Sequence, residues 1–319
     1  MNKCLCCYKP LEKGQVDFHP ACARKLFGRS LAPVVPYTRD NMYELAKKVI
    51  RTRASVTGVQ AKMSLGLDRG KRNEPDKLTI VGLWGRYILK PQSPKYRCLP
   101  ELEDVTMKMA QAAGIETATH SLIRLSDGEL SYITLRMDRT KDGRKVSMLD
   151  MCQLSNRISE HKYLGAYQQL AGTIKRYSAA SMLDVQRFWE VVLFSWITGN
   201  SDMHCKNFSL IEKYENEYVL APSYDLLAVL LVDPNDTDEL AMALEVGGKK
   251  AGFDRGAFMS SIIDSGVTEK AGEKIIKKMI SNAQKWYDIL DSSFLPEDMI
   301  AAYKKLIGKR IEMLRQAPS

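Results

Sequence analysis

The stretch 199–208, GNSDMHCKNF, places an Asp, a His, a Lys and two Asn within ten residues. It directly follows QRFWEVVLFSWIT (186–198), which is apolar on nearly every side. A helix with so few polar positions is expected to run through a core. A rigid buried helix that ends in a polar loop holds functional side chains in fixed positions. We therefore expect a functional site at 199–208.

A predicted hairpin follows this loop. NFSLIE (207–212), the turn KYENE (213–217) and YVLAPSYDLL (218–227) indicate two strands, the second stopping at Tyr224 and Asp225. The hairpin would return Asp225 to Asp202 and Asn207, and two carboxylates with an amide oxygen suit Mg²⁺ and a hydroxyl nucleophile. The spacing Asp202-x-x-x-x-Asn207 equals that of the protein-kinase catalytic loop, where a hairpin with a metal-binding Asp also follows.

Phosphoryl transfer also needs a loop over the phosphates, a cation and an acid that positions the cation. Candidates occur upstream in this order: the loop SVTGVQAK (55–62), Lys90 at the end of RYILK, and Glu101 or Glu103 in the next helix. The candidate loop residues are Ser55, Val56, Thr57, Gly58, Gln60 and Lys62. With Gly58 as its one glycine, the loop is a weak signal by itself, so the ordered combination carries the inference.

Each candidate also has a purely structural interpretation. Lys90 could end an exposed strand, and Glu103 could favour a helix N-terminus. Asp225 could be a turn residue, Asp202 could cap the loop after the helix, and His204 could be a hydrogen-bonded structural histidine. The combination favours the functional interpretation over these alternatives.

The remaining patterns predict an α+β chain. Strands are expected within 54–67, 77–90 and 121–138, with a helix over 99–114 ending near Gly114. Helices are expected at 148–153, 164–177 and 185–198, and again within 256–315. We expect a bilobal protein-kinase-like fold with a Cys/His-rich segment at 1–29, a small β-rich N-lobe at 30–137 and a larger helical C-lobe at 138–319.

Composition narrows the class of protein. The chain has 319 residues, a net charge of +9 and no apolar run of the roughly 20 residues that span a bilayer. The N-terminus has no apolar segment typical of a secretory signal, so we expect a cytoplasmic protein without a membrane partner. The basic charge favours polyanionic partners or serves solubility, and it does not choose between them.

The first 29 residues contain Cys4-x-x-Cys7 and His19-x-x-Cys22. Four soft ligands with these spacings are typical of a tetrahedral Zn²⁺ site. The alternative is a helix within FHPACARKLFG that docks on a neighbouring core with Cys22 and Phe27 buried. The sequence leaves both interpretations open.

The motifs together resemble the HipA-like serine/threonine kinases of bacterial toxin–antitoxin systems. SVTGVQAKMSL resembles that family's S-x-x-G-x-Q-x-K nucleotide loop, and YILKP resembles its ATP-lysine strand. GNSDMHCKNFSL resembles the family's G-N-x-D-x-H-x-K-N-F-S catalytic loop, and PSYDLLAV its metal-binding segment. Two motifs depart from the family, because Leu102 replaces the Asn of an E-N-E helix and Met137 replaces the Phe of an R-F-D-R hinge.

The resemblance implies roles for residues of the catalytic loop. Asp202 would act as base toward the substrate hydroxyl. Lys206 and His204 would lie near the phosphates or the nucleophile. Asn207 and Asp225 would hold Mg²⁺.

It also implies a binding site for ATP. Lys90 would bind the phosphates, steadied by Glu103. Leu135 and Met137 would offer backbone groups to adenine, with Asp138 near the ribose. In the family a Ser of the nucleotide loop is a self-phosphorylation site that silences the kinase, so Ser55, with Thr57 as alternate, is the candidate here.

The family also implies partners. Full-length HipA toxins carry a further N-terminal subdomain, whereas only about fifty residues precede the nucleotide loop here, as in the shorter HipT-like arrangement. The expected partners are a HipB-like helix-turn-helix antitoxin, a separate small HipS-like protein, or both, with DNA bound only through the antitoxin. The implied substrate is a protein, by family precedent an aminoacyl-tRNA synthetase.

Two other functions compete with a protein kinase. One is a small-molecule kinase of the aminoglycoside-phosphotransferase type, which shares the Asp-x-x-x-x-Asn arrangement. The other is an inactive kinase-like subunit that binds an antitoxin and DNA, consistent with the charge of +9.

Overall fold

The structure is a computed structural model that describes residues 2–42, 44–45, 62–71, 74–81, 84–233 and 242–316. The chain forms two compact units. The sheet unit comprises Met1–Asp104, Ala118–Lys145 and Ser292–Phe294. The helical unit comprises Val105–Thr117, Val146–Asp291 and Leu295–Ser319. The expected boundaries at residues 29 and 137 remain predictions.

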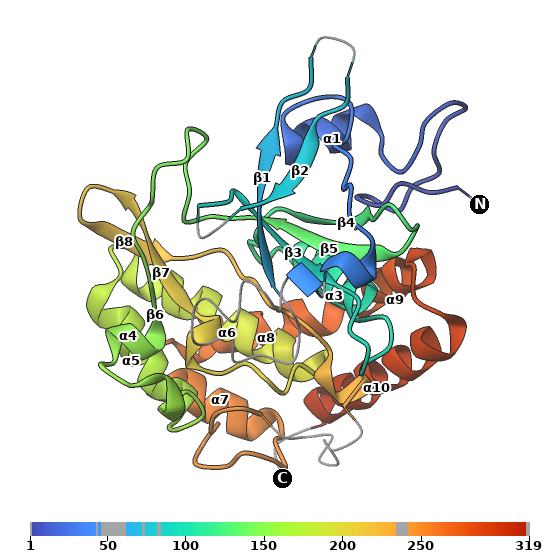
Figure 1. Ribbon diagram of the computed structural model, residues 1–319. Coiled ribbons are helices and arrows are strands. Elements are labelled where there is room, and N and C mark those ends of the chain that lie inside the picture. The colour runs from blue at the N-terminus through green and yellow to red at the C-terminus, as the bar shows by residue number, and fades with distance from the viewer. Residues whose placement is uncertain are drawn as a thin grey trace. The chain divides into compact units, whose positions relative to one another are not determined.

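The sheet unit is built on a five-stranded antiparallel sheet (Figure 1). Its strands are β1 (Met63–Asp68), β2 (Lys77–Ile80), β3 (Tyr87–Pro91), β4 (His120–Arg124) and β5 (Leu130–Leu135), in the order β2-β1-β3-β5-β4. The expected hairpin at 121–138 is confirmed as β4 and β5, which pair from His120↔Thr134 to Arg124↔Leu130. Lys90 is on β3, in the middle of this order.

Helix α1 (Pro20–Phe27) belongs to the core of the sheet unit. Ala23, Leu26 and Phe27 are buried, and the Phe27 ring lies 5.8 Å from that of Tyr87 on β3. Pro20 occupies the first helical position, where its missing N–H costs nothing. Docking of this helix by Phe27 is therefore confirmed, whereas Cys22 is only half-buried.

Helix α3 (Leu99–Ala112) begins in the sheet unit and continues into the helical unit. It ends as expected, because Gly114 adopts the left-handed conformation at φ +76° that glycine tolerates best. Its first turns are buried despite their acidic residues, and Glu103 and Asp104 are 1% and 0% exposed. Buried carboxylates require partners.

The helical unit contains most of the remaining elements. Its helices are α4 (Met151–Leu154), α5 (Tyr167–Tyr177), α6 (Ser181–Ile197), α7 (Arg255–Asp264), α8 (Glu269–Ser281), α9 (Ala283–Ser292) and α10 (Glu297–Arg315), with short 3₁₀ turns at Ser159–His161, Cys205–Asn207 and Val229–Leu231. Helix α6 contacts α5, α8 and α10, and all residues from Val191 to Ile197 are buried. The expectation of a helix through a core is confirmed.

A small sheet of β6 (Met148–Asp150), β7 (Ser209–Tyr214) and β8 (Glu217–Leu220) also belongs to this unit. The prediction of a helix over 148–153 was wrong in its first half, because Met148–Asp150 pairs with Ser209–Ile211 before α4 begins. The predicted β7–β8 hairpin is confirmed, but its second strand ends at Leu220 rather than at Tyr224. Pro222 follows closely, and proline cannot donate to a strand ladder.

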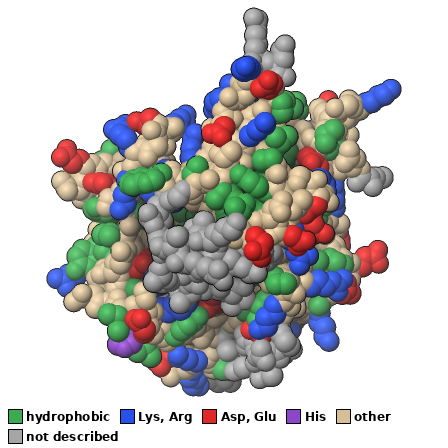
Figure 2. Space-filling view, viewed as in Figure 1, with side chains coloured by type: hydrophobic (Ala, Val, Ile, Leu, Met, Phe, Trp, Pro, Cys, Tyr) green, Lys and Arg blue, Asp and Glu red, His purple; other side chains and the backbone are tan. Residues whose placement is uncertain are grey.

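The mixed α+β class is confirmed by the two sheets and their helices. Among the described helices, none combines the length and the apolar character that crossing a bilayer would require. Figure 2 shows one face, on which Lys and Arg side chains are interspersed with Asp and Glu side chains. On the described part of this face, basic side chains thus lie among acidic ones.

Candidate functional site

The loop at 199–208 starts from a fixed corner at the end of α6. Gly199 has φ +75°, and a Cβ added there would lie 2.6 Å from Leu306 Cδ2. The N–H of Asn200 donates to Ser195 O at 2.8 Å and closes the corner. The polar residues that follow therefore leave the buried helix in a defined direction.

Asp202 is held at both its side chain and its backbone. The Tyr163 hydroxyl donates to Asp202 Oδ1 at 2.7 Å, and Asn207 Nδ2 donates to Asp202 O at 2.9 Å. The Asn207 contact closes a tight loop, and the next residue of that loop, Met203, accepts a bond from buried Tyr167 through its carbonyl at 2.8 Å. The carboxylate of Asp202 is thus oriented while its residue stays half-exposed.

His204 lies beside Asp202 and is 6% exposed. Lys162 Nζ donates to His204 Nε2 at 3.0 Å, and since an ammonium group only donates, the ring proton is assigned to Nδ1. Burial lowers the pKa of His204, while the charges of Asp202 and Asp225 oppose that effect. His204 Nδ1 has no hydrogen-bond partner within the described residues. The result is a neutral imidazole with a buried donor available.

Lys206, Asn207 and Asp225 complete the group in the helical unit. Lys206 Nζ donates to Ser159 Oγ at 3.0 Å, and the Tyr224 hydroxyl donates to Lys206 O at 2.9 Å. Because the amide nitrogen of Asn207 is used by Asp202 O, its oxygen is the atom left for a cation. Asp225 adopts φ +54° and is half-buried directly after Tyr224. Tyr224 thus contacts the candidate catalytic loop, and the charge of the next residue, Asp225, acts on His204 in that loop.

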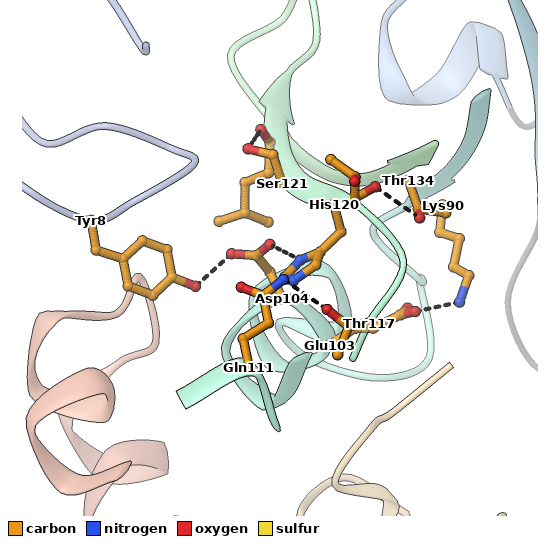
Figure 3. A network of polar contacts seen from close by, with 11 residues as sticks. Tyr8, Lys90, Glu103, Asp104, Gln111, Thr117, His120, Ser121 and Thr134 are labelled. Atoms are coloured by element: carbon orange, nitrogen blue, oxygen red, sulfur yellow. Dashed lines mark hydrogen bonds and ion pairs between the residues drawn. The ribbon is translucent and has the colours of Figure 1, made fainter. Parts of the chain in front are cut away.

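The sheet unit contains the second group of candidates, shown in Figure 3. Lys90 Nζ on β3 contacts Glu103 Oε1 on α3 at 2.5 Å, and both side chains are almost fully buried. The same ammonium lies 5.3 Å from the centre of the Tyr132 ring. Of the two acids considered from the sequence, Glu103 is the one that contacts Lys90.

A neighbouring network in Figure 3 was missed by sequence reasoning. Asp104 accepts a bond from the Tyr8 hydroxyl at 2.6 Å and one from His120 Nδ1 at 2.7 Å. Its three members come from the N-terminal segment, α3 and β4, so no local pattern joins them. The network fixes the turn of α3 that also carries Glu103.

The expected adenine-binding hinge comprises the end of β5 and the residues that follow it. The N–H of Leu135 donates to Thr119 O at 2.8 Å, so this donor is already used. Asp138 forms ion pairs with Arg136 at 2.7 Å and Arg139 at 2.8 Å. Burial raises the pKa of Asp138, but the two guanidinium groups outweigh it and the pKa is lowered. Asp138 is therefore a carboxylate.

Only some of the other expected site residues belong to the part of the chain that the structure describes. Ser55, Val56, Thr57, Gly58 and Gln60 lie outside the described residues, and Lys62 directly precedes β1. The ligand atoms of Cys4, Cys7, His19 and Cys22 all lie within 4.8 Å of one another.

Tyr163 and Lys162 are site residues that sequence reasoning missed. They belong to the connection between Ser159–His161 and α5. A parallel β-bridge joins Ala166 to Glu245, which lies in the segment MALEVGGK (242–249), and holds this connection in place. No spacing in the sequence points from Tyr163 to Asp202, because the contact joins residues 39 positions apart.

Comparison with models of protein families shows to which family this chain belongs. The model of the HipA-like C-terminal domain matches residues 54–287, which is most of the chain. The chain belongs to the HipA-like C-terminal domain family. The match includes Lys90, Glu103, Asp202, Asn207 and Asp225.

Curated relatives of this HipA-like chain bear the name "Putative kinase". A protein of Haemophilus influenzae is 23% identical over 98% of this chain and 98% of its own length. Y4dM of Sinorhizobium fredii is 32% identical and Y4mE of the same organism is 27% identical. The chain spans about half the length of these two Sinorhizobium relatives, 48% and 54%.

Solved structures confirm the fold expected from the sequence. HipA of Shewanella oneidensis MR-1, from a complex with HipB and operator DNA, has a TM-score of 0.65 at 20% identity, covering 85% of this chain and 71% of that one. The Helicobacter pylori proinflammatory kinase CtkA has a TM-score of 0.54 at 14% identity, covering 79% of this chain and 93% of that one. At these identities the likeness concerns the fold alone. The HipA-like chain thus has a kinase fold.

Proposed function

We propose that this HipA-like protein is an ATP- and Mg²⁺-dependent serine/threonine protein kinase. The observation that carries the proposal is the buried ion pair of Lys90 and Glu103 at 2.5 Å. A buried pair contributes little net stability compared with apolar residues of similar size, so its presence calls for another reason. In kinases such a pair holds the lysine that binds the ATP phosphates.

In this mechanism Lys90 binds phosphate oxygens of ATP while Glu103 holds its ammonium in place. The Tyr132 ring beside Lys90 Nζ restricts the side chain further. Glu103 itself sits on a helix turn fixed by Asp104 and its two partners. Positioning of this kind is the main protein contribution to phosphoryl transfer.

Asp202 takes the proton of the substrate hydroxyl as the hydroxyl oxygen bonds to the γ-phosphorus, while the bond from that phosphorus to the β–γ bridging oxygen breaks and ADP leaves. Tyr163 donates to one carboxylate oxygen and leaves the other for the substrate. The neutral His204 offers its Nδ1–H to an oxygen that gains negative charge. Lys206, which contacts Ser159 here, would supply a further cation.

The donor set of the helical unit fits Mg²⁺. The carboxylate of Asp225 and the amide oxygen of Asn207 are hard ligands of the type this ion prefers. When bound, Mg²⁺ neutralises charge on the β- and γ-phosphates. In this proposal the hydrogen bond from Asn207 Nδ2 to Asp202 O would leave the amide oxygen available to the ion.

For the nucleoside we propose the end of β5 and the segment that follows it. Met137 would contribute its backbone to adenine, and Leu135 its carbonyl, since the Leu135 N–H is used by Thr119. Asp138 would accept from a ribose hydroxyl while it stays paired with Arg136 and Arg139. The family resemblance of the R-x-D-R segment supports these roles.

We also propose self-phosphorylation at Ser55, with Thr57 as alternate acceptor. A phosphate there would add negative charge to the loop expected to cover ATP and would repel its phosphates. Intact mass after incubation with ATP and Mg²⁺ should rise by one phosphate in the wild type and not in Ser55→Ala/Thr57→Ala. An active enzyme whose mass does not change would contradict this part of the proposal.

The biological setting we propose is a toxin–antitoxin module. HipA of Shewanella oneidensis forms its complex with HipB and operator DNA, and by analogy this chain would bind a HipB-like antitoxin and reach DNA through it. A separate HipS-like protein is proposed as a further partner. The proposed substrate is a protein, with an aminoacyl-tRNA synthetase as the first candidate.

Transfer from radiolabelled ATP to the chain and to a cell lysate tests the proposed activity. Asp202→Asn should lower the rate about 10²–10⁴-fold, the usual contribution of a general base. Asp288→Asn, an exposed substitution of the same kind on α9, should leave the rate unchanged. Lack of label in the wild type, with ATP binding demonstrated, would instead favour a nucleotide-binding subunit without kinase activity.

A further inference from the structure

A cluster of soft ligands in the N-terminal segment lies outside the proposed kinase machinery. The Sγ atoms of Cys4, Cys7 and Cys22 and a ring nitrogen of His19 all lie within 4.8 Å of one another. In a tetrahedron of ligands around Zn²⁺, with Zn–S bonds of about 2.3 Å, neighbouring sulfurs are about 3.8 Å apart. The observed spacing is close to that of a filled site.

The local backbone presents these ligands from two directions. Cys4 and Cys7 belong to a tight loop closed by hydrogen bonds from Cys4 N to Lys9 O and from Tyr8 N to Cys4 O, both 2.9 Å. His19 is the extended residue before α1, and Cys22 lies in the first turn of that helix. A closed loop and a helix start thus each supply one ligand pair to a common point.

The orientation of His19 indicates which nitrogen faces the cluster. Its Nε2–H donates to Pro10 O at 2.9 Å, and Nδ1 lies 3.3 Å from Cys7 Sγ. A histidine that binds a metal usually donates its other ring N–H to a carbonyl or carboxylate in this way. The N–H of His19 also points to Cys4 Sγ at 3.4 Å, which favours a thiolate at that position.

Docking of α1 does not account for the cluster. The helix is anchored in the core by Ala23, Leu26 and Phe27, whereas His19 and Cys22 are only half-buried. Cys4 belongs to the core, and Cys7 and Cys22 pack against it, but apolar packing gives no reason for an imidazole to join three thiols there. The described cysteines, moreover, form no disulfides.

We propose that Cys4, Cys7, His19 and Cys22 form a structural Zn²⁺ site. Four protein ligands leave no open position, so the ion has a structural rather than a catalytic role. The site would hold together a segment that sends Leu5 into the sheet-unit core and the Tyr8 hydroxyl to Asp104. The inference is independent of the proposed phosphoryl transfer.

Metal content of the whole chain, purified without chelator, tests the site directly. We expect one equivalent of zinc in the wild type and in Cys6→Ser, since Cys6 lies within the loop but outside the ligand set. Cys4→Ser and Cys22→Ser should each lower zinc at least tenfold. Folded wild-type protein with under a tenth of an equivalent of zinc, or with iron in its place, would overturn the proposal, as would equal loss in Cys6→Ser.

Spectroscopy with Co²⁺ keeps the test valid if a Cys→Ser variant fails to fold. Addition of Co²⁺ to chelated wild type should produce thiolate charge-transfer absorption and the intense visible bands of a tetrahedral ion. His19→Cys keeps four soft ligands and should still bind Co²⁺, with stronger charge-transfer absorption from the added thiolate. Absence of both bands in refolded wild type would reject the site.

Discussion

At the scale of single residues, substitutions of Lys90 and Glu103 can separate an effect on phosphate transfer from an effect on stability. Glu103→Gln removes the carboxylate that contacts the buried Lys90 ammonium, which should lower the free energy of unfolding by about 3–5 kcal/mol. The double change Lys90→Met/Glu103→Leu removes both charges and should restore most of that stability. It should also abolish phosphate transfer. Urea denaturation and transfer from labelled ATP measure the two effects.

Lys77→Met on β2 is the matched control for this pair, because Lys77 is an exposed lysine in the same sheet. Neither stability nor phosphate transfer should change beyond the small effects usual for surface substitutions. A Lys90→Met/Glu103→Leu protein that still transfers phosphate would show that the pair is only structural.

Glu101, which lies two positions before Glu103 in the sequence, has a different environment. Burial raises its pKa from 4.5 to about 7, with smaller contributions from the charges of Glu129 and Asp104. The folded state therefore binds this proton more tightly than the unfolded state, and stability falls as pH rises from about 4.5 to 7. Above pH 7 the full cost of ionisation is present.

Glu101→Gln removes that cost. The variant should exceed the wild type by about 2–3 kcal/mol in the free energy of unfolding at pH 8, and the gain should shrink toward pH 5. Denaturation of both proteins at the two pH values measures the difference. An equal gain at both values would show that ionisation of Glu101 is not responsible.

At the scale of elements, the backbone at the end of α6 requires glycine at position 199. Gly199→Ala would place a Cβ 2.6 Å from Leu306 Cδ2 at a residue with φ +75°. The left-handed conformation alone costs a non-glycine residue about 1–2 kcal/mol, so thermal unfolding should begin at lower temperature. We also expect slower phosphate transfer, because the loop that carries Asp202 starts at this corner.

Gly172→Ala provides the opposite case within α5. The added Cβ would meet nothing within 4 Å, and alanine is favoured in helix interiors by about 0.5–1 kcal/mol. This variant should therefore be slightly more stable and fully active. If both glycine variants shifted thermal stability in the same direction, the conformational argument for Gly199 would be wrong.

Elements with a strong local pattern could be predicted from the sequence, and elements defined by distant partners could not. Helices α3 and α6 and the β4–β5 hairpin have clear periodicity or turn residues, and all three are confirmed. By contrast, Met148–Asp150 is a strand because it pairs with Ser209–Ile211, some sixty residues later in the sequence. A three-residue strand is too short for its own period to appear.

At the scale of the whole molecule, the order of motifs along the chain predicted which site residues belong to the same unit. It did not predict the hydrogen-bond partners of those residues. Asp202, Asn207 and Asp225 could be grouped because a hairpin returns the chain over a short distance. The contacts from Tyr163 to Asp202 and from Tyr8 to Asp104 join residues 39 and 96 positions apart. Single hydrogen bonds at such separation leave no pattern in one sequence.

The two groups of candidate residues belong to different units, so their cooperation in one reaction can be tested by combining variants. Lys90→Met and Asp202→Asn should each reduce the rate of phosphate transfer strongly. If Lys90 holds the phosphate that the Asp202-activated hydroxyl attacks, either loss removes most of what the other residue contributes. The double variant should therefore be slower than the slower single variant by only a few-fold.

The exposed pair Lys77→Met/Asp288→Asn should keep the wild-type rate, and thermal unfolding should verify that every variant is folded. A double variant whose loss equals the product of the two single losses would mean that the residues contribute independently and would contradict their joint action on one ATP.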